Sequence, residues 1–283
     1  MAGGVSRIGT WNLGRADREQ AATLVAAAGL DLLLLQDAPV QHLASFARAA
    51  GFDWACSAAD LQVQPPRSRW RSGAAAIAGR GTPPRARRLF TDVPHPLRMV
   101  LVELGTPWGP LTAVAYNTSR GLMSRQEELA HSLVLARWLE KVTGTVVVGT
   151  STLGPKTDHP DLGSLKTQQP TGSAGLETGE PGDDLMFGAR PIHQLDDALR
   201  RWFDTHPDEL DHERRLRPDG PLAVTYMTRP VAGRDGQPHR RDALWITRDL
   251  EVVHRPDHDY EGAVRAGGDH ALVIADLTRT LSR

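Results

Sequence analysis

The sequence Gly267-Gly268-Asp269-His270 places a carboxylate beside an imidazole, directly before the apolar run 271–277. An aspartate can bind a hard cation, and a histidine can bond an anionic oxygen or transfer a proton. The two glycines predict a turn, and the branched residues after them predict a buried strand. Taken alone, such a pair is also typical of a solvated turn, so its interpretation depends on how other segments end.

Other predicted strands also end in polar side chains. The first, over residues 5–13, carries Asn12 near its end, and the second, over 31–37, ends at Asp37. The second has the unbroken apolar character of a strand that is buried on both faces. Further strands are expected at 52–57, 72–78, 86–91, 98–105, 110–117, 145–149, 222–228, 241–247 and 271–277.

Helical periodicity and helix-forming residues alternate with these strands, which predicts an α/β protein. The segment 153–191 is rich in Pro, Gly, Thr and Gln and predicts a long irregular loop. An arginine-rich loop is expected at 64–71; its arginines around Trp70 could bind phosphate, although a solvated loop is favoured. Helices are expected at 16–28, 40–50, 122–142 and 196–206.

The composition restricts the class of protein. With 283 residues, 40% of them hydrophobic, and a formal net charge of -1, the chain can bury a large core but has no overall positive field for nucleic acid. The single Cys56 excludes an internal disulfide and a multi-thiolate zinc site, which suits a reducing compartment. No apolar run reaches about 18 residues. We therefore expect a cytoplasmic protein that does not span a membrane.

A series of short motifs, in this order and at fitting separations, resembles the endonuclease/exonuclease/phosphatase superfamily. The resemblance implies an α/β four-layer sandwich, in which two mostly antiparallel mixed β-sheets pack face to face with helices outside. It covers nearly the whole chain and favours one domain over 1–283. The motifs are Gly9-Thr10-Trp11-Asn12, Leu33-Leu34-Leu35-Gln36-Asp37, Ser72-Gly73-Ala74-Ala75-Ala76-Ile77-Ala78, Tyr116-Asn117-Thr118-Ser119, Val146-Val147-Val148-Gly149-Thr150-Ser151-Thr152, Thr225-Tyr226, Arg240-Arg241-Asp242-Ala243-Leu244-Trp245 and Gly268-Asp269-His270.

The resemblance also implies a magnesium-assisted hydrolysis of phosphate esters. Asn12, Asp37 and Asp269 match metal-site positions, for Mg²⁺ or for Mn²⁺ in its place. His270 matches the histidine that bonds the scissile phosphate, and Asp242 matches the carboxylate that orients this histidine and keeps it charged. The expected partner is a phosphate-ester substrate or ligand, nucleic acid among them.

The chain departs from the superfamily pattern at residues that carry chemistry. Asp37 stands where a longer Glu is usual, and Ser119 stands where a histidine is usual. Thr150 and Thr152 replace the Asp and Asn of the usual Gly-Asp-x-Asn motif. The missing Asp is the expected base for the attacking water, and losing such a base costs about 10²–10⁴ in rate. A replacement could come from the segment 158–161, which contains two aspartates and a histidine.

Three functions remain open from the sequence. The first is a divergent metal-dependent phosphoesterase with weakened or altered catalysis. The second is a catalytically inactive homologue that uses the inherited cleft to bind a phosphorylated ligand, nucleic acid or protein. The third is an enzyme of different chemistry on a small metabolite, which keeps the His270–Asp242 pair for proton transfer. The sequence does not indicate an oligomeric state.

Overall fold

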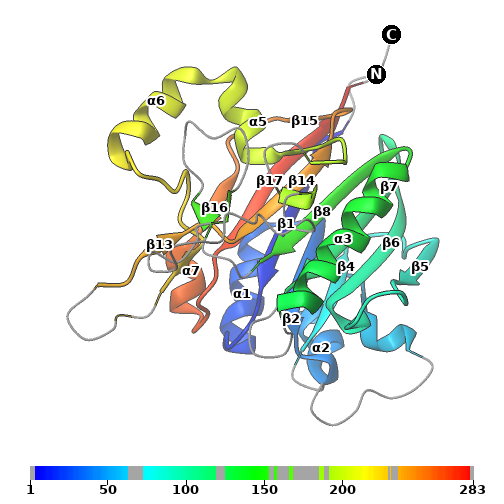
Figure 1. Ribbon diagram of the computed structural model, residues 1–283. Coiled ribbons are helices and arrows are strands. Elements are labelled where there is room, and N and C mark those ends of the chain that lie inside the picture. The colour runs from blue at the N-terminus through cyan, green and yellow to red at the C-terminus, as the bar shows by residue number, and fades with distance from the viewer. Residues whose placement is uncertain are drawn as a thin grey trace.

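In the residues that the structure describes, two large β-sheets lie face to face, and helices lie outside them (Figure 1). The first and last strands are neighbours, so the two ends of the chain build one sheet. This computed structural model describes residues 4–62, 73–118, 125–152, 156–157, 166–167, 185–187, 191–228, 230 and 235–280.

The first sheet has the strand order β15-β17-β1-β2-β4-β3, and β16 pairs with β17 beside this path. Strand β1 pairs parallel with β2 and antiparallel with β17. The strands are β1 (Ser6–Asn12), β2 (Leu32–Ala38), β3 (Trp54–Ser57), β4 (Ala74–Gly79), β15 (Leu250–Val252), β16 (Asp257–Asp259) and β17 (Leu272–Arg279).

The second sheet has the order β11-β14-β8-β7-β6-β5, with β7 and β8 parallel and the other neighbours antiparallel. Its strands are β5 (Ala86–Leu89), β6 (Met99–Thr106), β7 (Gly109–Asn117), β8 (Thr145–Ser151), β11 (Leu195–Asp197) and β14 (Asp242–Thr247). Short antiparallel pairs join β9 (Lys156–Thr157) to β10 (Lys166–Thr167) and β12 (Tyr226–Met227) to β13 (Pro238–His239).

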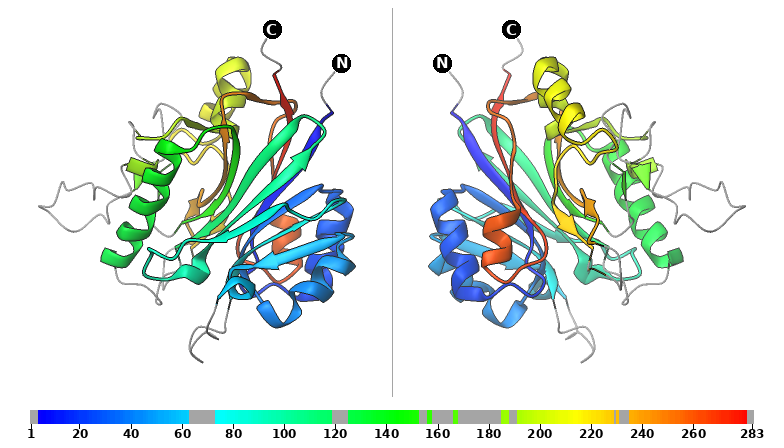
Figure 2. Two further views of the ribbon diagram at one scale, coloured as in Figure 1. Left: turned by 90° about the vertical axis from the view of Figure 1, so that its right-hand side faces the viewer. Right: turned by 90° about the vertical axis from the view of Figure 1, so that its left-hand side faces the viewer.

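Helices cover the outer faces of both sheets, which Figure 2 shows from two sides. Apolar side chains of α1 (Arg18–Ala28), α2 (Leu43–Ala49) and α7 (Tyr260–Arg265) pack on the first sheet, and those of α3 (Arg125–Lys141) pack on the second. Helix α5 (Ala198–Thr205) is followed by α6 (Pro207–Leu216), and short 3-10 turns lie at η1 (Val40–His42), η2 (Ala58–Leu61) and η4 (Pro96–Arg98). None of the described helices combines the length and apolar character needed to cross a bilayer.

The two sheets share one apolar core, to which Leu34 and Ile77 contribute from the first sheet and Val147 and Leu244 from the second. The two sheets are in tight contact at Gly149, where a Cβ atom would lie 2.5 Å from Thr10 Oγ1. Only glycine fits this contact without a shift of its neighbours. The predicted four-layer sandwich of mixed, mostly antiparallel sheets is therefore confirmed.

Some predicted elements differ from those observed. The strand expected over 222–228 is reduced to β12, because Leu222 and Ala223 pack against Leu199 and Phe203 of α5 instead of joining a large sheet. Strand β8 is longer than expected and continues through Ser151. Apolar periodicity finds buried residues, but it does not tell whether a helix or a sheet buries them.

Candidate active site

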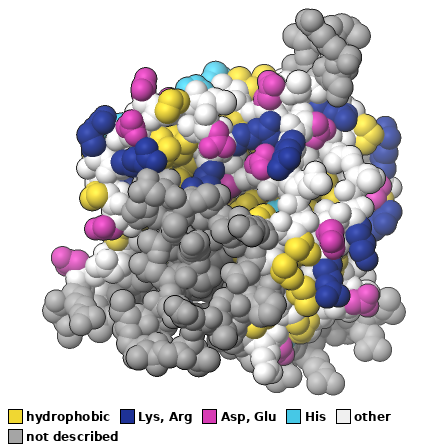
Figure 3. Space-filling model, turned by 45° about the horizontal axis from the view of Figure 1, so that its top comes forward, with side chains coloured by type: hydrophobic (Ala, Val, Ile, Leu, Met, Phe, Trp, Pro, Cys, Tyr) yellow, Lys and Arg dark blue, Asp and Glu magenta, His cyan; other side chains and the backbone are white. Residues whose placement is uncertain are grey.

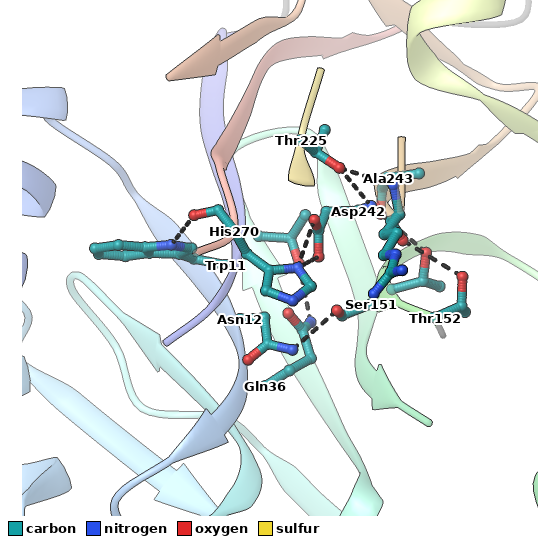
Figure 4. A network of polar contacts seen from close by, with 12 residues as sticks. Trp11, Asn12, Gln36, Ser151, Thr152, Thr225, Asp242, Ala243 and His270 are labelled. Atoms are coloured by element: carbon teal, nitrogen blue, oxygen red, sulfur yellow. Dashed lines mark hydrogen bonds and ion pairs between the residues drawn. The ribbon is translucent and has the colours of Figure 1, made fainter. Parts of the chain in front are cut away.

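His270 and Asp242 form a buried ion pair where β17 and β14 come together (Figure 4). His270 Nδ1 lies 3.0 and 2.9 Å from the two Asp242 carboxylate oxygens and donates to them, because an ionised carboxylate only accepts. Burial lowers the pKa of His270, but the Asp242 carboxylate and, further away, Asp269 outweigh it, so that the pKa is raised above 6.5. The pair thus favours a protonated imidazole.

The backbone around this pair is held by buried side chains. Trp11 Nε1 donates a 2.8 Å hydrogen bond to the His270 carbonyl, which ties β1 to the histidine. Thr225 Oγ1 accepts from the backbone N–H groups of Arg241 and Asp242 at 2.8 and 3.1 Å. These bonds fix the direction in which the imidazole and the carboxylate project.

Tyr226 and Arg241 border the same imidazole. The Tyr226 ring centroid lies 4.9 Å from that of His270, and the Arg241 guanidinium carbon lies 3.7 Å above the Tyr226 ring. The Arg241 charge is also felt at His270, where it opposes protonation. A stacked arginine beside a charged histidine is suited to bind an anionic group.

Asn12 and Asp269 direct oxygen atoms to a common place beside Gly14. A Cβ atom built on Gly14 would lie 3.2 Å from Asp269 Oδ1 and 3.6 Å from Asn12 Oδ1. Gly14 has a left-handed backbone (φ 47°), a conformation that favours glycine. Asn12 Oδ1 is buried and accepts no hydrogen bond from the described residues. A buried oxygen of this kind, next to a carboxylate, is a candidate cation ligand.

Ser151 is the β8 residue that faces Asn12. Asn12 Nδ2 donates a 3.0 Å hydrogen bond to Ser151 Oγ, and Ser151 is the strand partner of Asp242 (Figure 4). The sequence motif did not single out Ser151. Alternation places Ser151 on the same face of β8 as Gly149, but only the neighbours of the strand show that this face meets Asn12.

Thr150 lies on the opposite face of β8 from Ser151. Its hydroxyl accepts from Trp245 Nε1 at 3.2 Å and donates to the Ala243 carbonyl at 3.3 Å, within the α3 side of the sheet. Thr152 Oγ1 donates to the Arg241 carbonyl at 3.4 Å. Thr150 thus has its partners on β14 and Thr152 has its partner directly before that strand, and neither hydroxyl bonds His270 in the described residues.

Asp37 is held by Arg98, at the end of the 3-10 turn η4 before β6, and by Asn117, at the end of β7. Arg98 Nη1 forms an ion pair with Asp37 Oδ1, and Asn117 Nδ2 donates a 3.0 Å hydrogen bond to Asp37 Oδ2. Arg98 is almost completely buried, and Asp37 is partly exposed. Sequence analysis missed Arg98, because nothing in the spacing connects it with Asp37.

The predicted site residues form one continuous row across the rim of the sandwich. Asp37 bonds Asn117, Asn117 is the strand partner of Ser151, and Ser151 bonds Asn12 and pairs with Asp242. Asp242 in turn binds His270, which follows Asp269 in the chain. The structure thus links Asn12, Asp37, Asp242 and His270 through Asn117 and Ser151, and their convergence on one cation remains a prediction.

The two oxygen atoms beside Gly14 suit a hard divalent cation that takes its other ligands from water or substrate. Magnesium is commonly held by one or two carboxylates, several waters and substrate phosphate, and Asn12 and Asp269 offer one amide oxygen and one carboxylate. No group of three or more His, Cys, Asp or Glu side chains able to hold a metal occurs in the part of the chain that the structure describes. The assignment of Asp37 as a third ligand remains a prediction.

A small cavity of about 170 Å³ opens beside Gly14, between α1 and α2. Its walls are mostly apolar, and two arginines border it. Neither Asn12 nor Asp269 lines it, although Gly14 does. The lining residues are Leu13, Gly14, Arg15, Ala16, Arg18, Ala21, Pro39 and Phe46.

Some predicted residues lie outside the described part of the chain. These are Ser119, the candidate replacement bases in 158–161, and the arginine-rich segment 64–71 with Trp70. In the face drawn in Figure 3, basic and acidic side chains are interspersed over the coloured surface.

Several solved structures share this fold over nearly the whole chain. The endonuclease/exonuclease/phosphatase from Bacteroides vulgatus has 11% identity and a TM-score of 0.63, over 98% of this chain and 100% of that one. D. rerio TDP2, complexed with a single-strand DNA product, has 11% identity and a TM-score of 0.58, over 97% and 99%. The mannosyl-6-phosphatase Bt3783 of Bacteroides thetaiotaomicron has 10% identity and a TM-score of 0.56, over 96% and 99%. No protein-family model and no curated protein matches the sequence.

The class that the architecture defines is therefore a face-to-face α/β sandwich with its polar residues gathered at one rim. The chain has the fold of the endonuclease/exonuclease/phosphatase superfamily. The resemblance predicted from the motifs is confirmed at the level of the fold.

Proposed function

We propose that the chain is a hydrolase of phosphoric esters, with the His270–Asp242 pair as its phosphate-binding centre. The main support for this proposal is that Asp242 holds His270 in one orientation and keeps the pKa of its ring raised. His270 Nε2 can then donate a hydrogen bond to a phosphate oxygen. The solved structures of the same fold include a phosphatase and a DNA-bound enzyme, which supports a phosphate ester as the substrate class.

Asn12 and Asp269 are the residues that would hold Mg²⁺ or Mn²⁺. The ion would supply positive charge against the phosphate oxygens. Arg241, stacked on Tyr226 beside His270, adds a fixed positive charge at the other side of the imidazole. These groups surround the phosphate dianion with positive charge and hydrogen-bond donors, at the place where negative charge develops during the displacement.

The end of β8 makes the proposed reaction slow. Ser151 faces Asn12 and carries a hydroxyl where a carboxylate would be needed to deprotonate water at neutral pH. Without that base we expect a rate lower by about 10²–10⁴ than that of an enzyme that has one.

A panel of single-stranded DNA, RNA and small phosphomonoesters and diesters, assayed with Mg²⁺ and with Mn²⁺, tests the proposal. We expect turnover that a chelator abolishes and that His270→Ala and Asp269→Ala remove. As a matched control, His254→Ala changes an exposed histidine of the same chain and should keep the wild-type rate. Equal rates for wild type and both site variants on every substrate would contradict hydrolysis.

A second candidate is an inactive homologue that binds a phosphorylated ligand. It is favoured by the absence of an acidic residue among Gly149, Thr150, Ser151 and Thr152 and by the ion pair that engages Asp37. Titration with inorganic phosphate and with a 5′-phosphorylated oligonucleotide distinguishes the inactive homologue from the hydrolase. Binding that His270→Ala abolishes, without turnover in the panel, would select this second function.

Metal-independent turnover of a small metabolite that His270→Ala abolishes would instead select different chemistry on the same pair.

A further inference from the structure

Arg98 is a buried guanidinium paired with the carboxylate that the sequence predicts to bind metal. Its side chain is 3% exposed, against 24% for Asp37, and its Nη1 forms an ion pair with Asp37 Oδ1. The second oxygen, Asp37 Oδ2, accepts a 3.0 Å hydrogen bond from Asn117. Both oxygens of the carboxylate are therefore engaged by donors that the protein itself supplies.

The backbone fixes the direction of this carboxylate. Asp37 has φ 50°, in the left-handed region, and the pairing of β2 with β4 shifts register between Leu35 and Ala38. Gly73 lies so close that a Cβ atom there would be 2.9 Å from Asp37 Cα. Such an irregularity re-aims a side chain, and the close packing of Gly73 holds it in place. The carboxylate is thus aimed at Arg98 by the fold.

Arg98 also keeps its charge in this environment. A guanidinium does not lose its proton in proteins, so it pairs with Asp37 at every pH at which Asp37 is ionised. Its field extends to the neighbouring imidazole of His131, where it is one of the causes that lower the pKa to about 4, after burial and the charge of His95. His131 therefore stays neutral at neutral pH.

We propose that Arg98 is a built-in competitor of the divalent cation, which withholds Asp37 from the metal. The inference rests on the proposed function only in taking Asn12 and Asp269 as the metal ligands. A cation at the rim would then be held without the third protein ligand, and weakly. Because Arg98 belongs to the same chain, it is present at a high effective concentration whatever the metal concentration.

Direct measurement of Mn²⁺ binding, by electron paramagnetic resonance and calorimetry on the full chain, tests this role. In Arg98→Gln the Asp37 carboxylate becomes available and a positive charge is removed, so we expect Mn²⁺ affinity to rise about tenfold or more. The double variant Arg98→Gln/Asp37→Asn removes both charges together. It should bind Mn²⁺ as wild type does, because wild type gains nothing from Asp37.

Two results would overturn the proposal: unchanged affinity in Arg98→Gln, or a loss of about tenfold or more in the double variant, which would show Asp37 to be a ligand despite Arg98. If Arg98→Gln fails to fold because Asp37 is left unpaired, the double variant decides alone, since it leaves neither charge behind.

The outcomes also separate this inference from the proposed function. Mn²⁺ binding by Arg98→Gln but not by wild type would support the role of Arg98 while contradicting a metal-loaded wild-type site. Loss of Mn²⁺ binding in Asp269→Ala with no effect of Arg98→Gln would support the metal site of the proposed function and contradict the role of Arg98.

Discussion

The side-chain amide of Asn12 donates a 3.0 Å hydrogen bond to the hydroxyl of Ser151, across the gap between the two sheets. Both side chains are almost fully buried. Ser151, and not Thr150, therefore occupies the place on β8 from which a carboxylate would face the rest of the site.

Ser151→Asp should increase phosphoesterase activity. The new carboxylate would accept from Asn12 Nδ2 and could act as the missing base, which is worth about 10²–10⁴ in rate. Thr150→Asp is the matched control, because it places the same charge on the opposite face beside Trp245. We expect no gain in rate there, and a loss of unfolding free energy on the order of 3–5 kcal/mol for the unpaired buried charge. A rate increase in Thr150→Asp alone would contradict this assignment of faces.

Phosphate binding should weaken as the pH rises through the raised pKa of His270, because only the protonated ring donates from both nitrogens. The stability contribution has the same sign. Since the folded pKa lies above the unfolded value of about 6.5, the contribution is complete below that pH and is lost as the pH rises through the folded pKa. Asp242→Asn removes the larger of the two causes that raise the pKa while burial remains, so the pKa of His270 should fall. Carbon-13 NMR of the His270 ring measures both values.

His131 should give the opposite pH dependence. Its Nε2 accepts from the His95 N–H at 3.0 Å, and burial, followed by the charge of His95, lowers its pKa to about 4. The unfolded chain therefore binds a proton more readily, and stability is lost as the pH falls from 6.5 toward 4. At pH 5 the loss is about 2 kcal/mol. The free energy of unfolding, measured with urea at neutral pH and at pH 5, should fall at the lower pH in wild type and not in His131→Gln. An equal fall in both proteins would contradict the prediction.

Gly14→Ala should lower both stability and Mn²⁺ affinity. Its left-handed backbone disfavours any side chain by about 1–2 kcal/mol, and the new methyl group would lie 3.2 Å from Asp269 Oδ1. Gly29→Ala is the control, because Gly29 is also left-handed (φ 66°) and has no atom within 4 Å of its Cβ position. Chemical unfolding should show similar losses for both variants, while calorimetry should show weaker Mn²⁺ binding for Gly14→Ala only. Equal Mn²⁺ affinities would exclude a cation beside Gly14.

Residues at the ends of strands could be predicted well from the sequence. Asn12 and His270 each stand at the border of a strong apolar run, and the structure brings these strand ends to one rim. The His270–Asp242 pair was expected from the motifs and is present with two short contacts. The local apolar runs and the short motifs were therefore sufficient to predict the fold.

Other features depend on geometry that these local signals do not contain. Strand β8 is apolar on both faces, so alternation did not distinguish Thr150 from Ser151 until its neighbours were known. The pairing of Asp37 with Arg98 joins residues far apart in the sequence through a left-handed backbone at Asp37, which single-sequence patterns do not predict.

The antiparallel pairing of β1 with β17 also has a consequence for biosynthesis. Trp11 and Asn12 leave the ribosome long before Asp269 and His270, their neighbours in the folded protein. A nascent chain can form much of the β1–β2–β4 region while it still lacks Asp242, Asp269 and His270. Translation that stops before Asp269 would release a chain that lacks both Asp269 and His270 at the rim.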